Sequence, residues 1–195
     1  YSNLIYPPVQ MDVTDPDSVT EAVEKVAGSV GRLDILVNNA GINRPNDFDN
    51  IHWVEWNEVL AVNLTGPFLV SRLFWPLLND GAAIVNIGSV SGFIGGKRST
   101  HYCASKAGLV GLTENIALFG AKREIRCNLV APGYVRSNMA DKGMENEIVR
   151  KTVDEIPLGR LAESGEIANA VLFLASPLAS YITAATIHCN GGLYF

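Results

Sequence analysis

The sequence predicts an α/β protein in which a doubly wound parallel sheet carries helices on both faces. Short apolar runs of strand length alternate with segments whose apolar residues recur at helical spacing. The short runs are apolar at consecutive positions, which is typical of parallel strands buried on both faces. Small or polar residues follow the runs, at the carboxyl ends where such sheets bind ligands.

Length and composition agree with one domain over residues 1–195. The net charge is −5, and 48% of the residues are hydrophobic. The chain has no basic run, so we expect no nucleic-acid partner, and no apolar run reaches the ~18 residues of a membrane span. Three cysteines without C-x-x-C spacing and the lack of a secretion signal predict free thiols in a cytoplasmic protein. The histidines lack metal-ligand spacing, so no metal site is expected.

The elements are predicted from these runs in chain order. Val9–Val13 is a strand candidate, and a helix begins at Pro16, because proline is favoured in a first helical turn. The elements that follow are a buried strand (Leu33–Val37), a loop (42–50), a helix (53–78), a strand (Ala83–Ile87), a helix through Tyr102 to about Lys122, a strand (Ile125–Val130), a polar segment (134–156), a helix (Ser164–Ala175) and a last strand (Ala184–Cys189).

The stretch from Ser89 to Lys106 contains the candidate catalytic residues. Tyr102 and Lys106 are four residues apart and therefore share one face of the predicted helix. A tyrosine with an ordinary pKa of about 10 transfers protons poorly at neutral pH, but a neighbouring cation favours the phenolate. Ser89 could hold a carbonyl or alcohol oxygen against the tyrosine. The pattern predicts acid/base chemistry on a carbonyl/alcohol pair, although the same spacing also occurs on exposed helices where tyrosine packs and lysine is solvated.

Motifs along the whole chain resemble those of the classical short-chain dehydrogenase/reductase family. In order they are D-V-T-D (Asp12–Asp15), N-N-A-G (Asn38–Gly41), N-L-T-G (Asn63–Gly66), Ser89, Y-C-A-S-K (Tyr102–Lys106), A-P-G-Y-V (Ala131–Val135) and P-L-G-R (Pro157–Arg160). The resemblance implies a Rossmann-type fold and an NAD(P)-dependent oxidoreductase that interconverts a carbonyl and a secondary alcohol by hydride transfer. The motifs are most similar to those of 3-oxoacyl-carrier-protein reductases, with polyol or sugar dehydrogenases of the same family as the alternative.

The resemblance also implies roles for single residues. Tyr102 would be the general acid in reduction and the base in oxidation, and Lys106 would lower its pKa and bind the nicotinamide ribose. Ser89 would orient the substrate oxygen. Asn63 would hold a local opening in its helix and bind a water that links Lys106 to solvent. The implied contacts of the cofactor, NAD or NADP, are Asp12, Val13, Asn39, Ala40, Gly41, Tyr102, Lys106, Pro132, Gly133, Val135 and Ser137, which replaces the family's threonine.

Residues 134–160 are interpreted as a substrate-loop segment within the domain. Its basic residues lie beside several acidic residues. This mixed charge does not indicate whether the segment binds an acyl carrier protein or a small polyol. The expected partner is a small carbonyl or alcohol, free or bound to acyl carrier protein. The resemblance further implies a homotetramer or homodimer. The preference for NAD or NADP is left open, because the residue that decides it ends a strand that this sequence does not contain.

One feature of the family is absent from the sequence. The glycine-rich T-G-x-x-x-G-x-G turn, which binds the cofactor pyrophosphate, is missing together with the first two strands of the fold. The strand Leu33–Val37 is therefore expected to leave an unpaired apolar edge. We expect either that an N-terminal part precedes these residues or that they are a proteolytic remnant. A polypeptide of these 195 residues alone is expected neither to bind the dinucleotide tightly nor to fold stably.

Two smaller departures lie near the last strand. Thr183-Ala184-Ala185 stands where the family tends to have threonine-glycine, and Asn190 replaces an aspartate. Tetrameric members pack this strand across a subunit interface, so these departures concern the assembly rather than the chemistry.

Two other classes of function are alternatives. A non-catalytic scaffold of the same fold would agree with the missing turn, but Tyr102 and Lys106 are both retained. A serine hydrolase would use Ser89 with His101, yet the sequence has no G-x-S-x-G turn and no acid placed to orient the histidine. His101 is therefore interpreted as a loop or helix-start residue.

Overall fold

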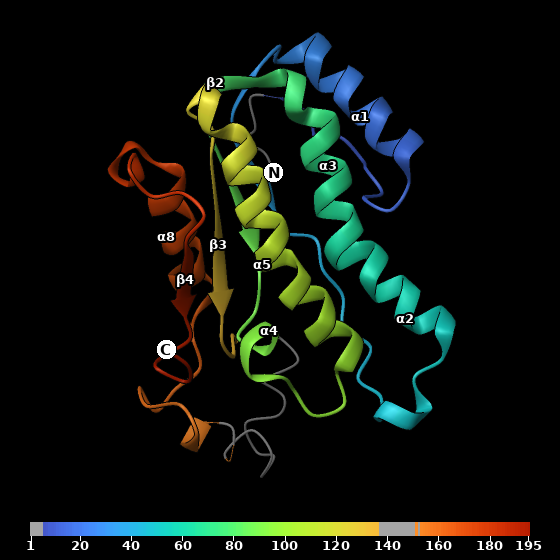
Figure 1. The fold of residues 1–195 in the computed structure, drawn as a ribbon, viewed down its shortest axis with the longest axis vertical. Coiled ribbons are helices and arrows are strands. Elements are labelled where there is room, and N and C mark those ends of the chain that lie inside the picture. Colours follow the sequence, from blue (N-terminus) through green and yellow to red (C-terminus); the bar gives the residue numbers. More distant parts are fainter. Residues whose placement is uncertain (1–5, 137–150, 152) are drawn as a thin grey trace.

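A parallel sheet forms the centre of the fold in the computed structural model, which describes residues 6–136, 151 and 153–195 (Figure 1). Within these residues the sheet has four strands in the order β1-β2-β3-β4. Every neighbouring pair is parallel. The strands are β1 (Leu33–Asn38), β2 (Leu78–Ile87), β3 (Arg126–Pro132) and β4 (Thr186–Cys189). The predicted Rossmann-type parallel α/β architecture is confirmed.

Helices cover both faces of this sheet (Figure 1). On one face, α5 packs Ala117 against Ile84 of β2, and α3 packs against β1 and β2. On the other face, α8 packs Leu174 against Val85 and Val130. The helices are α1 (Pro16–Ser29), α2 (Trp53–Leu60), α3 (Gly66–Phe74), the short α4 (Ser91–Ile94), α5 (Thr100–Gly120) and α8 (Ser164–Ala175).

The predicted strand Val9–Val13 is wrong. Its residues pair with no strand in the described part of the chain. Met11 and Val13 instead pack onto the apolar cluster that α1 and α3 share, beside Leu69. The segment has the composition of a strand, but a strand needs a neighbour whose backbone can accept and donate its hydrogen bonds.

The single helix predicted over residues 53–78 is interrupted. A π-helical turn, Ala61–Thr65, separates α2 from α3, and Asn63 lies within this turn. A 3₁₀ turn, Trp75–Leu77, then ends the helical segment. Pro76 lacks the N–H that would continue an α-helix at this point.

The edge strand β1 exposes apolar side chains. It pairs with β2 on one side and with no other described strand. Ile35 is 48% exposed and Val37 is 39% exposed, and α8 packs mainly against β2, β3 and β4. The unpaired apolar edge expected from the sequence is therefore present. Among the described residues, no helix combines the length and apolar character of a membrane span.

Candidate active site

Ser89, Tyr102 and Lys106 meet where β2 ends and α5 begins. Ser89 follows β2, and its hydroxyl interacts with the phenol of Tyr102. Lys106 is one turn further along α5, and only 4% of it is exposed. Its Nζ donates a 2.7 Å hydrogen bond to the Ile87 carbonyl and lies 5.7 Å from the centre of the Tyr102 ring. The helix thus presents both side chains to the carboxyl edge of the sheet.

The charge state of this pair differs from the sequence-based expectation. Burial raises the pKa of Tyr102, and the interaction with Ser89 opposes this rise without reversing it. Burial also lowers the pKa of Lys106 from 10.5 to about 8. In the ligand-free protein the net direction of the Tyr102 pKa is therefore upward, and the lowering effect of Lys106 stays a prediction. The ammonium group faces the ring and the Ile87 carbonyl, and desolvation of the phenolate dominates.

Asn63 links the π-helical turn to the loop after β1. Its side chain makes two hydrogen bonds with the peptide groups of Ile42, accepting from the N–H and donating to the carbonyl, each at 2.8 Å. It also donates to Ser105 Oγ at 3.1 Å. Gly41 lies against this residue, since a Cβ on Gly41 would be 3.4 Å from Asn63 Oδ1 and 3.5 Å from Lys106 Nζ. A buried asparagine in a helix is stable here because both of its polar atoms have partners.

Two hollows flank the carboxyl end of β1, and they share Val37 and Asn39. The smaller one, of about 190 Å³, is also lined by Val13 and Ala40. The larger one, of about 440 Å³, opens towards α8 and is also lined by Ile87, Pro132 and Val135. Five of the residues that the resemblance implied for the cofactor therefore lie around two adjoining spaces at one edge of the sheet, namely Val13, Asn39, Ala40, Pro132 and Val135.

The other described residues of the predicted cofactor set do not line these hollows; they are Asp12, Gly41, Tyr102, Lys106 and Gly133. Asp12 Oδ1 accepts hydrogen bonds from the N–H and the hydroxyl of Thr14, and these bonds lower the pKa of the carboxyl group. Asp12 therefore stabilises the turn before α1. Ser137 lies outside the described residues.

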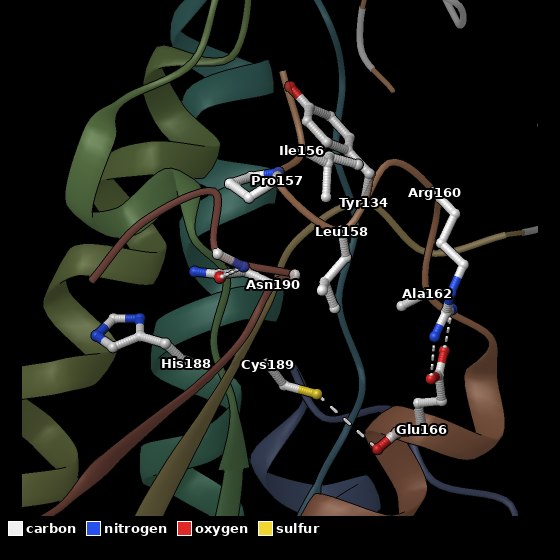
Figure 2. A pocket seen from close by; sticks show the side chains of 12 residues that line it. Tyr134, Ile156, Pro157, Leu158, Arg160, Ala162, Glu166, His188, Cys189 and Asn190 are labelled. Carbon is white, nitrogen blue, oxygen red and sulfur yellow. Dashed lines mark hydrogen bonds and ion pairs between the residues drawn. The ribbon is translucent and has the colours of Figure 1, made fainter. Parts of the chain in front are cut away.

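The described ends of the predicted substrate segment meet around a third hollow, of about 470 Å³ (Figure 2). Tyr134 contributes from one end of the segment, and Ile156, Pro157 and Leu158 contribute from the other. Arg160 forms an ion pair of 2.7 Å with Glu166 at the start of α8. Cys189 Sγ points towards the Glu166 carbonyl, as Figure 2 shows.

The sequence reasoning missed a buried polar network behind the site. Asn38 Nδ2 donates to Asn86 Oδ1 at 2.7 Å, and Asn86 Nδ2 donates to Thr113 Oγ1 at 2.9 Å. The network joins β1, β2 and α5 directly beside Ile87, the acceptor of the Lys106 ammonium. The sequence did contain a sign of this network. An asparagine follows apolar residues in each of two predicted strands, Asn38 in L-V-N and Asn86 in I-V-N.

Comparisons with known proteins agree with this architecture. The model of a family described as enoyl-(acyl carrier protein) reductase matches residues 2–194. A 3-oxoacyl-(acyl-carrier-protein) reductase FabG of Aquifex aeolicus (strain VF5) is 44% identical over 188 residues, covering 95% of this chain and 75% of the relative.

Solved structures show the same relationship. A blue fluorescent protein from a metagenomic library, in complex with NADPH, superposes with a TM-score of 0.89 at 33% identity, covering 95% of this chain and 75% of that one. A short-chain dehydrogenase/reductase described as glucose/ribitol dehydrogenase, from Brucella melitensis, has a TM-score of 0.85 at 30% identity, covering 95% and 74%.

The parallel sheet and these matches define an NAD(P)-dependent oxidoreductase. The chain belongs to the short-chain dehydrogenase/reductase family and is similar to FabG.

Proposed function

We propose that this protein interconverts a carbonyl and a secondary alcohol, with Tyr102 as the general acid/base. The observation that carries the proposal is the placement of a half-buried Tyr102, a buried Lys106 and Ser89 at the same sheet edge as the two hollows around β1. Because burial raises the pKa of Tyr102, the phenol keeps its proton at neutral pH in the ligand-free protein.

Four residues of the chain have separate roles in this proposed reaction. A bound nicotinamide dinucleotide supplies or accepts the hydride. Ser89 holds the substrate oxygen against Tyr102, which gives its proton to that oxygen in reduction and takes it back in oxidation. Lys106 stabilises the phenolate that remains after proton donation, because a cation favours the charged form. Asn63 holds the π-helical turn and the Ile42 loop beside Lys106, and we propose that a water bound there connects Lys106 to solvent.

The residues around β1 fit NAD or NADP. Asn39, Ala40 and Gly41 follow the strand without bulky side chains, and Gly41 leaves Lys106 Nζ and Asn63 Oδ1 open to this edge. The ammonium of Lys106 donates a hydrogen bond to the Ile87 carbonyl and, with three N–H groups, has further donors for ribose hydroxyls. We propose that Pro132, Gly133 and Val135 place the nicotinamide, and that Asp12, Val13 and Ser137 complete the set. The NADPH complex of the metagenomic relative supports this assignment.

For the substrate, we propose a 3-oxoacyl thioester, free or on acyl carrier protein, bound with the help of residues 134–160. The similarity to FabG of Aquifex aeolicus supports this choice. A polyol or sugar is the second candidate, supported by the likeness to the protein described as glucose/ribitol dehydrogenase.

We further propose a single domain over residues 1–195 that assembles into a homodimer or homotetramer in the cytoplasm. An apolar groove of about 490 Å³ between α3 and α5, lined by Phe68, Trp75, Ile116 and Phe119, supports the assembly, since exposed apolar surface of this kind marks contact sites. The three free cysteines, Cys103, Cys127 and Cys189, support a reducing compartment.

The test is oxidation of NADPH or NADH by the protein with a 3-oxoacyl thioester, and reduction of the oxidised cofactors with polyols. Tyr102→Phe is expected to lower kcat by at least 10²-fold, because a general acid/base contributes roughly 10²–10⁴-fold. The circular dichroism spectrum should stay unchanged. Turnover by Tyr102→Phe at the wild-type rate would refute the proposal, and the absence of any turnover by a folded wild type that binds the cofactor would favour the scaffold alternative.

A further inference from the structure

His101 is the buried residue directly before Tyr102. It is the second residue of α5, and it has no exposed surface. Its Nδ1 accepts a hydrogen bond of 2.9 Å from the backbone N–H of Tyr102. Neither the catalytic role proposed above nor the family motifs quoted from the sequence include this residue.

The first turn of α5 explains why this hydrogen bond matters. The first N–H groups of a helix have no acceptor within the helix and usually bond to the side chain of the N-cap residue. The N-cap residue of α5, Ser99, makes no such bond, because its hydroxyl accepts from Asn43 Nδ2 at 3.2 Å instead. His101 therefore supplies the acceptor that Ser99 does not supply to Tyr102.

The other ring nitrogen of His101 faces a carboxylate. Because Nδ1 accepts a hydrogen bond, the neutral ring carries its proton on Nε2. Nε2 is buried without a hydrogen-bond partner in the described part of the chain, and it faces Glu55 Oε1 of α2 at 3.7 Å. The second oxygen of Glu55 accepts from Asn46 Nδ2 at 3.3 Å. The imidazole thus lies between the backbone of Tyr102 and an anchored carboxylate.

We propose that His101 is a positioning residue for Tyr102. Its Nδ1 fixes the backbone of the first turn of α5, and the ring lies beside the carboxylate of Glu55. The direction of a side chain follows from its backbone, so this turn sets where the phenol meets Ser89 and the substrate oxygen. The inference rests on the proposed role of Tyr102 and adds a residue that touches no reacting atom.

Two substitutions separate the two ring nitrogens. Asparagine places its Oδ1 at about the position of Nδ1, so His101→Asn keeps the acceptor for Tyr102. Glutamine places its amide nitrogen at about the position of Nε2, so His101→Gln keeps the group that faces Glu55 and loses the acceptor. His52→Gln is the matched control, because His52 is exposed and makes no side-chain capping bond at the start of α2.

The experiment measures steady-state kinetics and amide hydrogen exchange at Tyr102 in the full chain. His101→Gln is expected to lower kcat and to speed exchange of the Tyr102 amide, each by roughly tenfold, the size of effect that a lost helix cap gives. KM should stay within about twofold, since no substrate contact is removed. His101→Asn should retain most of kcat and the slow exchange. Equal losses in both variants, or wild-type values in His101→Gln, would overturn the proposal.

A measurement on the wild type keeps the proposal testable if a variant does not fold. Nitrogen-15 NMR of the histidine rings should show that Nδ1 of His101 accepts a hydrogen bond, and a proton on Nδ1 would overturn the inference. Tyr102→Phe distinguishes the two proposals. If it is inactive while His101→Gln behaves as wild type, only the positioning role fails, whereas an active Tyr102→Phe removes the proposed function itself.

Discussion

At the scale of single residues, Ala184 has a backbone conformation that suits glycine. Its φ is 58°, and it lies where the family tends to have glycine. Its N–H donates to the Cys127 carbonyl at 2.8 Å, so the contact with β3 holds this conformation in place. A residue with a Cβ destabilises the folded protein by about 1–2 kcal/mol when it adopts this conformation. Glycine avoids this cost, but it raises the conformational entropy of the unfolded chain, which offsets part of the gain.

Ala184→Gly is therefore expected to raise the free energy of unfolding by about 0.5–1 kcal/mol. Urea denaturation followed by circular dichroism measures this change. A decrease in stability would show that the methyl group of Ala184 contributes more through packing than its backbone costs.

Lys106 predicts a dependence of stability on pH. Because burial lowers its pKa to about 8 in the folded protein, the unfolded chain binds more protons than the folded chain between about pH 8 and the ordinary pKa of 10.5. The contribution of Lys106 to the free energy of unfolding therefore rises with pH across this window, and falls as the pH drops to 8. The raised pKa of Tyr102 acts with the opposite sign, but only above its ordinary value of 10.0.

We expect the free energy of unfolding of the wild type, relative to Lys106→Met, to rise by on the order of 2 kcal/mol from pH 8 to pH 10. Denaturant titrations at several pH values measure it, with Lys122→Met as a control on an exposed lysine. A difference that is flat with pH would mean that Lys106 keeps its ordinary pKa in the folded protein.

At the scale of elements, α4 packs against α5 through Gly92. A Cβ on Gly92 would lie 2.9 Å from the carbonyl carbon of Lys106 and 3.0 Å from the backbone nitrogen of Ala107. These are backbone atoms of a helix and cannot move aside as a flexible side chain would. The close approach keeps the segment after Ser89 against the helix that carries Tyr102.

Gly92→Ala is expected to destabilise the protein by about 1–3 kcal/mol, the usual cost of overpacking, and to lower kcat because α4 and the neighbouring Ser89 are displaced. Gly111→Ala is the matched control. A Cβ on Gly111 would meet no atom within 4 Å, so this change in the exposed middle of α5 should stabilise the helix by about 1 kcal/mol. If Gly92→Ala left stability and kcat unchanged, this contact would have no part in positioning the site.

At the scale of the whole molecule, the apolar edge at β1 predicts self-association of the 195-residue polypeptide. Ile35 and Val37 are exposed on a strand whose outer backbone groups have no strand partner among the described residues. Lysine on an edge strand opposes pairing with another edge. The double substitution Ile35→Lys and Val37→Lys should therefore raise several-fold the concentration at which the protein stays monodisperse in light scattering.

The control for this prediction is Val54→Lys on α2, where valine is 78% exposed but lies on no strand. It should leave the scattering unchanged. If Val54→Lys reduced association as much as the double substitution, the cause would be the added net charge rather than the strand edge.

Much of the fold could be predicted because it depends on short-range patterns. The apolar runs placed all four described strands, and helical spacing together with the residues at its ends placed α8 at Ser164–Ala175 as predicted. The four-residue spacing of Tyr102 and Lys106 put them on one face of α5 without knowledge of any distant contact. The order of motifs identified the family, which the comparisons confirm.

Tertiary structure alone decided the features that depend on neighbours far away in the chain. Val9–Val13 has the composition of a strand but no partner in the described sheet. The direction of the Tyr102 pKa depends on how much water the surrounding elements exclude, which spacing does not reveal. His101 meets Glu55 only because α2 packs against α5. The sequence by itself thus determined the family and the placement of Tyr102 and Lys106 on one face of α5. Strand pairing, the burial of Tyr102 and Lys106 and the contact between His101 and Glu55 were decided only by the tertiary structure, because each depends on residues far apart in the chain.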